Sequence, residues 1–253
     1  MIRHLSLGLV WCALCLPARF LAAAPAEGER TATEGRTLAE KLCGLALPEN
    51  SAYTGVLHVR RPKTKPAKIP LRCVALLTAT NWQTIYTSES PSPDPGIVLT
   101  VIHTEGQPNE YWLKSTAGPT GPGDPGVRQT GNGAMIPFAG TDFWLFDFGL
   151  EFLHWPTQRI VKKEMRRGRF CEVLESVNPH AAPGTYARVL SWIDQETTGL
   201  LRAEAYDTDR RLLKEFSVGS FTKVNGQWRV RDVEIRDERT GSRTRLELDL
   251  HAD

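Results

Sequence analysis

The feature that most constrains the fold is a long series of short segments in which apolar and polar residues alternate. These segments are rich in Val, Ile, Thr, Tyr and Trp, and turn residues such as Arg167-Gly168 and Asn225-Gly226 separate them. Alternation with a period of two is the pattern of a half-buried β-strand, and two-residue turns with glycine join antiparallel neighbours. The pattern predicts strands over residues 53–61, 69–77, 82–87, 97–103, 110–114, 158–166, 169–176, 186–194, 199–206, 212–223, 228–237 and 242–250.

The spacing of these segments disfavours a nucleotide-binding α/β fold, because no long helical pattern separates the predicted strands. Residues 117–134 are rich in Gly and Pro and predict an irregular loop between two series of strands. The first series alone would leave an open sheet with an uncovered apolar face. We therefore expect one mainly β domain over residues 37–253, in which both halves share a curved antiparallel sheet.

The N-terminal residues 1–26 have the pattern of a secretory signal peptide. Arg3 precedes an apolar run over residues 5–16, and small residues follow at 22–24. The run is shorter than the roughly 18 apolar residues that span a bilayer. Cleavage after residue 24 and cleavage after residue 26 both fit. Neither Cys12 nor Cys15 follows a small residue, so we expect a soluble periplasmic protein that is not a lipoprotein.

The segment after the predicted cleavage site has two parts. Residues 27–36 are small, polar and charged without an apolar period, which predicts a flexible leader. Thr37 with Glu40 three positions later is a helix N-terminal capping pattern, and Leu38 and Leu42 lie on one helical face. A short amphipathic helix is therefore expected to begin at Thr37.

The distribution of charge argues against nucleic acid as a partner. The whole chain has 31 basic and 29 acidic residues, and the predicted signal peptide removes two arginines, which leaves 29 of each. Basic residues gather at 60–72 and at 162–169, around two predicted hairpins. Such runs usually protect sheet edges or face solvent. Their functional alternative is contact with an anionic membrane surface or an acidic envelope protein.

Motifs of catalytic and metal sites are missing from the sequence. There is no Gly-x-Ser-x-Gly, no Walker lysine and no His-Glu-x-x-His. The histidines after the signal peptide stand singly, so no metal or cofactor is predicted; they are His58, His103, His154, His180 and His251. Asp142, Asp147 and Glu151 could form a carboxylate group, but capping and turn hydrogen bonds explain them more simply. Three cysteines remain, Cys43, Cys73 and Cys171, so one disulfide or three buried thiols fit equally well.

Residues 135–156 are unusually aromatic. They include Phe138, Phe143, Trp144, Phe146, Phe148, Phe152 and Trp155. Thr141 or Asp142 is positioned to cap a single helical turn here. Two interpretations fit this segment. Its aromatic side chains either plug one end of the curved sheet as core, or line a cavity for a hydrophobic ligand.

Several strings in the second half carry a family resemblance. They are FAGTDFW at 138–144, LHWP at 153–156, CEVLESVNP at 171–179, VLSWID at 189–194, AYD at 205–207, KEF at 214–216 and KVNGQW at 223–228. With these strings, residues 135–250 resemble the outer membrane lipoprotein-sorting protein family, the LolA-like proteins, including their uncharacterised TP0789-type domains. The resemblance implies an incomplete, half-open antiparallel β-barrel with a helical plug and a hydrophobic cavity for acyl chains. The loop at 117–134 and the basic segment at 60–72 depart from the family's sorting chaperones.

The resemblance implies a ligand cavity without catalytic residues. The residues expected to line it are Phe143, Trp144, Phe146, Leu150 and Phe152, with Leu38 and Leu42 of the N-terminal helix as a lid. Three functions follow in order of support. The first is an exported carrier for a lipid or for lipoprotein acyl chains. The second is a non-catalytic envelope scaffold or interaction protein. The third is a lipid hydrolase, which no sequence motif supports.

Overall fold

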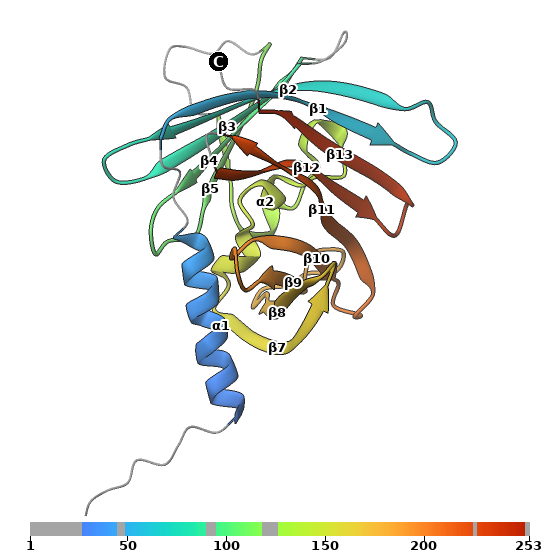
Figure 1. Ribbon diagram of the computed structural model, residues 1–253. Coiled ribbons are helices and arrows are strands. Elements are labelled where there is room, and N and C mark those ends of the chain that lie inside the picture. The colour runs from blue at the N-terminus through green and yellow to red at the C-terminus, as the bar shows by residue number, and fades with distance from the viewer. Residues whose placement is uncertain (1–26, 45–48, 90–94, 118–125, 225–226, 251–253) are drawn as a thin grey trace, which may run out of the picture.

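The computed structural model describes residues 27–44, 49–89, 95–117, 126–224 and 227–250, so the predicted signal peptide lies outside the described residues. A single 13-stranded sheet dominates the structure (Figure 1). Its strands are β1 (Ser51–Arg60), β2 (Ala67–Leu77), β3 (Trp82–Ser88), β4 (Ile97–His103), β5 (Glu110–Ser115), β6 (Val127–Gln129), β7 (Thr157–Arg166), β8 (Arg169–Val177), β9 (Arg188–Asp194), β10 (Leu200–Tyr206), β11 (Leu212–Val224), β12 (Gln227–Asp237) and β13 (Ser242–Asp249). The helices are α1 (Glu27–Cys43) and α2 (Leu145–Phe148), with short 3-10 turns η1 (Gly131–Ala134), η2 (Phe138–Gly140) and η3 (Glu151–His154).

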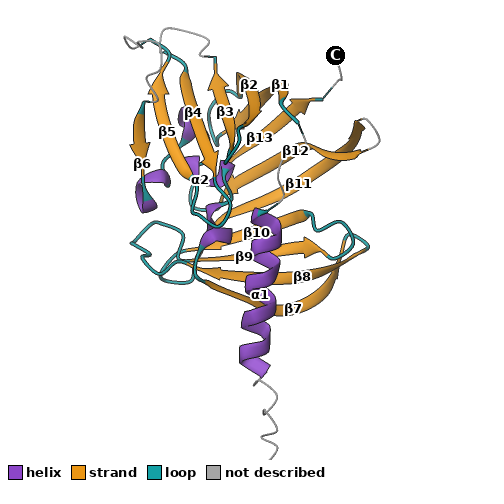
Figure 2. Ribbon diagram, turned by 90° about the vertical axis from the view of Figure 1, so that its left-hand side faces the viewer, coloured by secondary structure: helices purple, strands orange, loops and turns teal. Residues whose placement is uncertain are grey.

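The topology is a meander that returns to its first strand. The strand order is β6-β5-β4-β3-β2-β1-β13-β12-β11-β10-β9-β8-β7, and neighbouring strands are antiparallel. Strand β13 pairs with β1, with Leu57 opposite Leu246, so both halves of the chain contribute to one sheet. Strands β6 and β7 are the two edges and the sheet is not closed between them (Figure 2). The predicted fold class, a mainly β, curved antiparallel sheet in an incomplete barrel, is confirmed.

Local sequence explains most strands and their turns. In β1, Gly55, Leu57 and Val59 are buried while the residues between them are more exposed, as period-two alternation requires. At the β7–β8 turn, Arg167 and Gly168 have φ angles of 48° and 76°. Two successive positive φ values give the hairpin turn whose twist matches that of the flanking strands.

The core lies on the concave side of the sheet. One large apolar cluster joins strand residues to residues 134–153. Its largest fully buried side chains are Phe138, Phe146, Tyr186, Leu57, Leu99, Leu145, Leu174, Ile193 and Ile235. A second, small cluster of Cys171, Val173 and Trp192 is separate from it. Figure 1 shows α2 between the upper strands β1–β5 and the lower strands β7–β10, so short helical turns fill the concavity.

Helix α1 corrects the prediction for the N-terminal residues. Residues 27–36 are not a flexible leader, because the helix begins at Glu27 instead of Thr37 and continues to Cys43. A Cβ on Gly35 would lie 2.4 Å from the Cα of Arg159, so the backbones of α1 and β7 are in close contact. Docking on the sheet stabilises a stretch that has no apolar stripe of its own. No helix in the described ranges is long and apolar enough to cross a membrane.

Part of the stretch at 117–134, which was expected to be an irregular loop, also has regular structure. Val127–Gln129 forms β6, which pairs with β5, and Gly131–Ala134 forms η1, whereas residues 118–125 lie outside the described residues. A strand of three residues is too short to show an alternation. Thr141 or Asp142 was predicted to cap a helical turn, but the residue at the N-cap of α2 is Trp144. The backbone N–H of Trp144 donates to the Asp147 carboxylate at 2.7 Å.

Candidate functional site

The segment 131–155, called the plug below, closes the concave side of the sheet. It consists of η1, η2, α2 and η3, which are short because Ala139 and Leu150 adopt left-handed backbone angles, with φ of 47° and 46°. Aromatic rings bind the plug to the sheet and to itself. The Phe148 ring lies 4.5 Å from the ring of Tyr86 in β3 and 5.1 Å from that of Phe138.

Polar anchors fix the middle of the plug to β13. The carboxylate of Asp142 accepts hydrogen bonds from the hydroxyl groups of Ser242 and Thr244, the latter at 2.7 Å. The backbone N–H of Asp142 donates to the Thr244 hydroxyl at 3.0 Å. The carboxylate and the backbone N–H of Asp142 therefore both hold the plug in place on β13.

A buried lysine anchors the same part of the plug to β11. The ammonium of Lys214 donates to the carbonyl oxygen of Asp142 at 2.5 Å, lies 3.7 Å from the centre of the Trp144 ring, and is 3.8 Å from the Asp147 carboxylate. Asp147 also accepts from the Tyr186 hydroxyl at 3.0 Å. Burial lowers the pKa of Lys214 to about 8 and raises the pKa of Asp147, although the two charges oppose these shifts. The pair is a structural anchor in a low-dielectric core.

The structure brings the predicted cavity residues into one cluster. Phe143, Trp144, Phe146 and Phe152 are buried, Leu150 is half-buried, and Leu38 and Leu42 of α1 pack against the same core. The void that Leu150 and Phe152 line has a volume of only about 20 Å³, which is room for about one water molecule. These side chains thus fill the concave side themselves in this conformation.

A groove lies at the open side of the barrel, next to the plug. It has a volume of about 520 Å³, and the turn before β5, β6 with η1, and residues 178–180 form its walls. Met135, Phe146 and Trp155 of the plug contribute to its lining, with the rings of Phe146 and Trp155 5.7 Å apart. We call it the open-side groove; it reaches the plug through both apolar and polar side chains.

An acidic side chain sits at this groove. Glu151 accepts hydrogen bonds from the Tyr111 hydroxyl at 3.0 Å and from the backbone N–H of Asn109 at 3.2 Å. Burial raises the pKa of Glu151 to about 7 even though these two hydrogen bonds lower it. The Asn109 side chain donates in turn to the carbonyl oxygen of Gly149 at 2.8 Å, which ties the turn before β5 to the plug.

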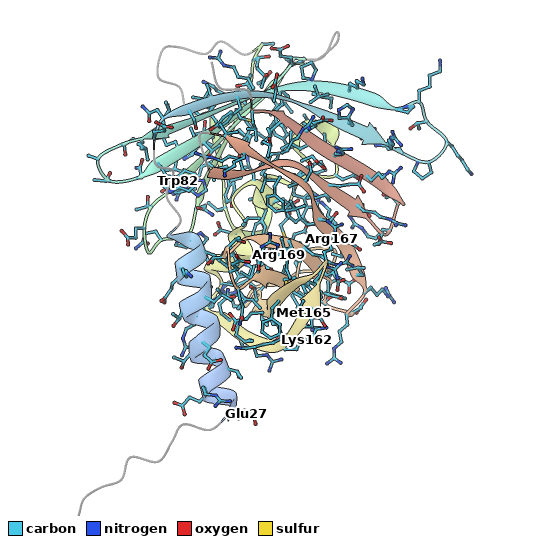
Figure 3. The ribbon with its side chains drawn as sticks, in the orientation of Figure 1. Glu27, Trp82, Lys162, Met165, Arg167 and Arg169 are labelled. Carbon is cyan, nitrogen blue, oxygen red and sulfur yellow. The ribbon has the colours of Figure 1, made fainter. Side chains whose placement is uncertain are left out.

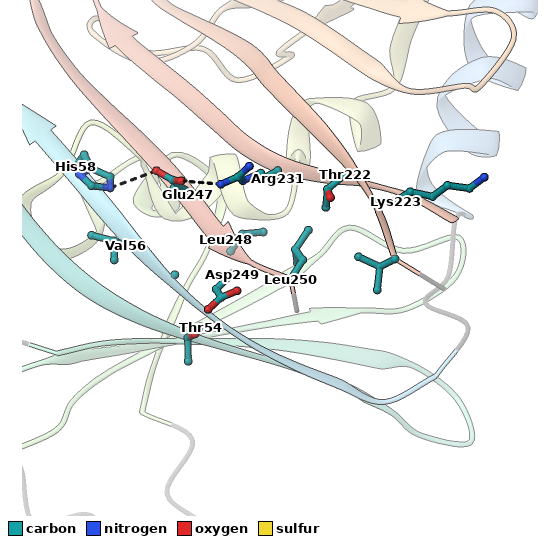
Figure 4. A pocket seen from close by; sticks show the side chains of 12 residues that line it. Thr54, Val56, His58, Thr222, Lys223, Arg231, Glu247, Leu248, Asp249 and Leu250 are labelled. Atoms are coloured by element: carbon teal, nitrogen blue, oxygen red, sulfur yellow. Dashed lines mark hydrogen bonds and ion pairs between the residues drawn. The ribbon is translucent and has the colours of Figure 1, made fainter. Parts of the chain in front are cut away.

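A second groove, of about 700 Å³, lies where strands β12 and β13 part (Figure 4). Their pairing ends at Asp232 and Glu247, although both strands continue. Its walls carry charges: Glu247 lies 3.6 Å from His58 and 3.5 Å from Arg231. His58 alternates with the buried residues of β1 and so faces away from the plug. This groove is larger than the open-side groove, and its lining mixes these charged side chains with apolar ones such as Val56, Leu248 and Leu250.

The acidic residues of the plug do not form a carboxylate group. The carboxylates of Asp142, Asp147 and Glu151 each bind different groups, which agrees with capping and anchoring roles. Among the described residues, no group of three or more His, Cys, Asp or Glu side chains is placed to hold a metal ion. Cys43, Cys73 and Cys171 are free thiols, so no disulfide joins them. Burial raises the pKa of Cys43 to about 11 and that of Cys73 to about 12.

Sequence reasoning missed two features of the site. It gave no role to Lys214, because a lysine within a strand is ordinarily exposed. It also missed Asn109, which lies just before the predicted strand at 110–114, and Tyr111, which lies near the start of that strand. The inward position of Tyr111 follows from that alternation, but its partner Glu151 lies 40 residues away in the chain.

Comparisons with known proteins support this architecture. Residues 125–250 match the model of a family described as "Uncharacterized protein". No curated protein matches the chain. Among solved structures, a DUF1329 family protein from Desulfovibrio piger has a TM-score of 0.71 at 19% identity, covering 87% of this chain and 92% of its own. A Vibrio parahaemolyticus domain assigned as an outer membrane lipoprotein-sorting protein has a TM-score of 0.70 at 19% identity, covering 86% and 91%.

A third neighbour carries the superfamily name. The LolA superfamily protein NE2245 from Nitrosomonas europaea has a TM-score of 0.61 at 16% identity and covers 85% of this chain and 91% of its own. The chain thus has the fold of the LolA-like proteins, and the resemblance to outer membrane lipoprotein-sorting domains is confirmed at the level of the fold. At these identities the likeness establishes architecture, and function must be argued from the site.

Proposed function

We propose that this protein is an exported, non-catalytic carrier that binds a lipid, or the acyl chains of a lipoprotein, on the concave side of the half-barrel. Its role would be transport or sorting to the outer membrane. The observation that carries the proposal is that short helices and turns, not strands, cover the apolar concave face. A plug of this kind can move without breaking the hydrogen-bond ladder of the sheet, and it then uncovers apolar surface. The signal-peptide pattern at residues 1–26 supports export to the periplasm.

The energetics of exchange favour a reversible carrier. Moving one CH2 group out of water contributes about 0.8 kcal/mol, so a chain of sixteen carbons contributes on the order of 12 kcal/mol. Displacing the plug withdraws several buried aromatic side chains, each worth roughly 1.5–3 kcal/mol. Phe138, Phe143, Trp144, Phe146 and Phe152 are the main ones. The two contributions are of similar size, so cargo can replace the plug and the plug can later expel the cargo.

The open-side groove is the proposed access route. Its volume of about 520 Å³ lies within the roughly 300–1,000 Å³ of small-molecule sites. Phe146 belongs both to its lining and to the core cluster. An acyl chain that enters the groove therefore meets the plug directly and can take the place of its side chains.

Native mass spectrometry with organic extraction tests the proposal. The mature protein is purified from a bacterial periplasm without detergent. We expect a phospholipid or an acylated peptide bound at close to one per protein. An empty protein that also takes up no added phospholipid contradicts the carrier function.

Matched variants locate the bound lipid. Trp155→Glu places a charge at the open-side groove, whereas Phe221→Glu places one on an exposed position of β11. We expect the first variant to lose bound lipid and the second to retain it. Equal occupancy in both would show that the lipid lies elsewhere. Circular dichroism of both variants checks that the fold is intact.

A second candidate function is a non-catalytic envelope scaffold. The observation that favours it is the tight filling of the concave side, where the void beside Leu150 and Phe152 is only about 20 Å³. In this case the plug is permanent core and the surface makes the contacts. A protein that stays empty in the mass spectrometry experiment, and that takes up no added phospholipid, supports this function.

A further inference from the structure

The turn between β7 and β8 exposes an unusual combination of residues. Residues 165–170, called the hairpin tip below, have the sequence Met-Arg-Arg-Gly-Arg-Phe. The side chains of Met165 and Phe170 are 63% and 47% exposed, although both are large and apolar. They stand directly opposite each other in the strand register, so they share one face of the hairpin.

Two of the three arginines of the hairpin tip make no ion pair in the described part of the chain, so their charges remain available to bind a partner. Arg169 pairs with the buried Asp194 at 3.0 Å and with Glu196 at 3.3 Å. No ion pair in the described part of the chain involves Arg166 or Arg167. Arg167 donates to the carbonyl oxygen of Val218 at 2.8 Å. The guanidinium of Arg166 lies 5.4 Å from the centre of the Trp192 ring. Figure 3 shows Met165, Arg167 and Arg169 on this hairpin, with Lys162 further along β7.

Protection of the sheet edge accounts for only part of this pattern. Strand β7 is an edge strand, and charged residues on an edge discourage pairing with other chains. Lys162 and Lys163 fit that role, and each is balanced by an acid, Glu164 and Glu172, at 2.7 Å. Edge protection gives no reason to expose a methionine and a phenylalanine on either side of the arginines, because apolar side chains make an edge more adhesive.

We propose that the hairpin tip docks the protein on an anionic lipid surface. Met165 and Phe170 enter the boundary between headgroups and acyl chains, while Arg166 and Arg167 bind lipid phosphates. The shape fits this partner, because the turn projects outward: a Cβ on Gly168 would meet nothing within 4 Å. Two apolar side chains on a narrow tip are too few for the core of a stable protein interface. They suit insertion between lipids, which needs no complementary pocket.

Vesicle co-sedimentation tests the proposal. The full mature protein is mixed with vesicles of phosphatidylethanolamine and phosphatidylglycerol, or with vesicles of phosphatidylcholine alone. We expect binding to the anionic vesicles that weakens as salt shortens the Debye length from about 10 Å at 0.1 M to about 3 Å at 1 M. The double variant Arg166→Gln/Arg167→Gln should bind about 25-fold more weakly. The variant Met165→Ser/Phe170→Ser should bind at least about tenfold more weakly.

Control variants remove the same groups elsewhere. Phe221→Ser deletes an aromatic side chain that is 43% exposed on β11. Lys65→Gln/Lys68→Gln deletes two charges from the other basic hairpin, where both lysines are exposed. Both controls should bind vesicles like the unmodified protein. The proposal is overturned when the unmodified protein ignores anionic vesicles, or when the tip variants bind no more weakly than the controls.

Docking and cargo binding are measured separately. Bound lipid in the purified protein is determined by mass spectrometry for the tip variants as well, and we expect it to be unchanged. Loss of vesicle binding with intact cargo assigns docking to the tip. A protein that carries lipid but whose tip variants bind vesicles normally refutes the docking surface alone and leaves the carrier function standing.

Discussion

Replacing Glu151 with glutamine is expected to stabilise the protein at neutral and alkaline pH. Burial raises the pKa of Glu151 from its ordinary value of 4.5 to about 7. Between these two values the folded protein binds more protons than the unfolded chain, so its stability falls as pH rises. The contribution of the protonated carboxyl is complete below about pH 4.5 and is lost as pH passes through about 7. Glutamine has no proton to lose and can still accept the hydrogen bond of the Tyr111 hydroxyl.

The size of the effect follows from the same shift. A difference of about 2.5 pKa units corresponds to roughly 3 kcal/mol of unfolding free energy at pH 8. Glu151 is only half-buried, and solvent screens part of that penalty. We therefore expect the unfolding free energy of Glu151→Gln to exceed that of the unmodified protein by about 1–3 kcal/mol at pH 8 and by less than about 1 kcal/mol near pH 5. The raised pKa of Asp147 acts in the same direction in both proteins, so it cancels in the comparison.

Urea denaturation followed by circular dichroism at several pH values between about 5 and 8 measures this difference. Glu105→Gln is the matched control, since Glu105 is exposed on the turn between β4 and β5. Its stability profile should run parallel to that of the unmodified protein. A Glu151→Gln profile that is also parallel, or a variant less stable than the unmodified protein at pH 8, refutes the reasoning.

Three further substitutions probe how the plug and α1 are held. Lys214→Met leaves a buried carboxylate and a carbonyl oxygen without their cation, and urea denaturation should show a loss of about 3–5 kcal/mol; a loss below about 1 kcal/mol would contradict the anchoring role. Gly35→Val places a side chain against the backbone of β7, so trypsin should cut α1 faster than in Gly28→Val, where space is open; equal rates would speak against the docking of α1. Asp142→Ala removes two hydroxyl hydrogen bonds from β13 and should cost about 1–3 kcal/mol in the same assay. An esterase activity that this last variant loses while it remains folded would revive the hydrolase hypothesis.

The strands could be predicted from the sequence because their signals are local. Each predicted strand is found within a few residues of its expected bounds, since alternation and turn residues such as Arg167-Gly168 act over short stretches of chain. The aromatic segment was expected either to plug one end of the curved sheet or to line a ligand cavity. What its residues do was not decided by composition, because Phe146 satisfies both descriptions: it is buried in the core and it lines the open-side groove.

The features that escaped prediction depend on tertiary contacts. Helix α1 extends back to Glu27 because Gly35 allows close contact with β7. No pattern in residues 27–36 indicates that this segment packs against a strand. Lys214 is buried because β11 has an irregular register opposite Ala205 and Tyr206, which places Leu213 and Lys214 inward in succession. A bulge of this kind inverts the alternation on which strand assignment rests.

The plug is held by different contacts in its middle and at its η3 end, and this difference bears on how a carrier could open. Its middle, around Asp142 and Asp147, is fixed by buried hydrogen bonds and by the ammonium of Lys214. Its η3 end is fixed through Glu151, a group whose charged form burial disfavours near neutral pH. The buried side-chain amide of Gln158 also donates to the carbonyl oxygens of Phe152 and Trp155, each at 2.9 Å. The attachment through Glu151 therefore weakens as pH rises through neutrality, whereas the one through Gln158 does not titrate. That end borders the open-side groove, so a pH-sensitive attachment lies where, in the proposed carrier, an acyl chain would first reach the core.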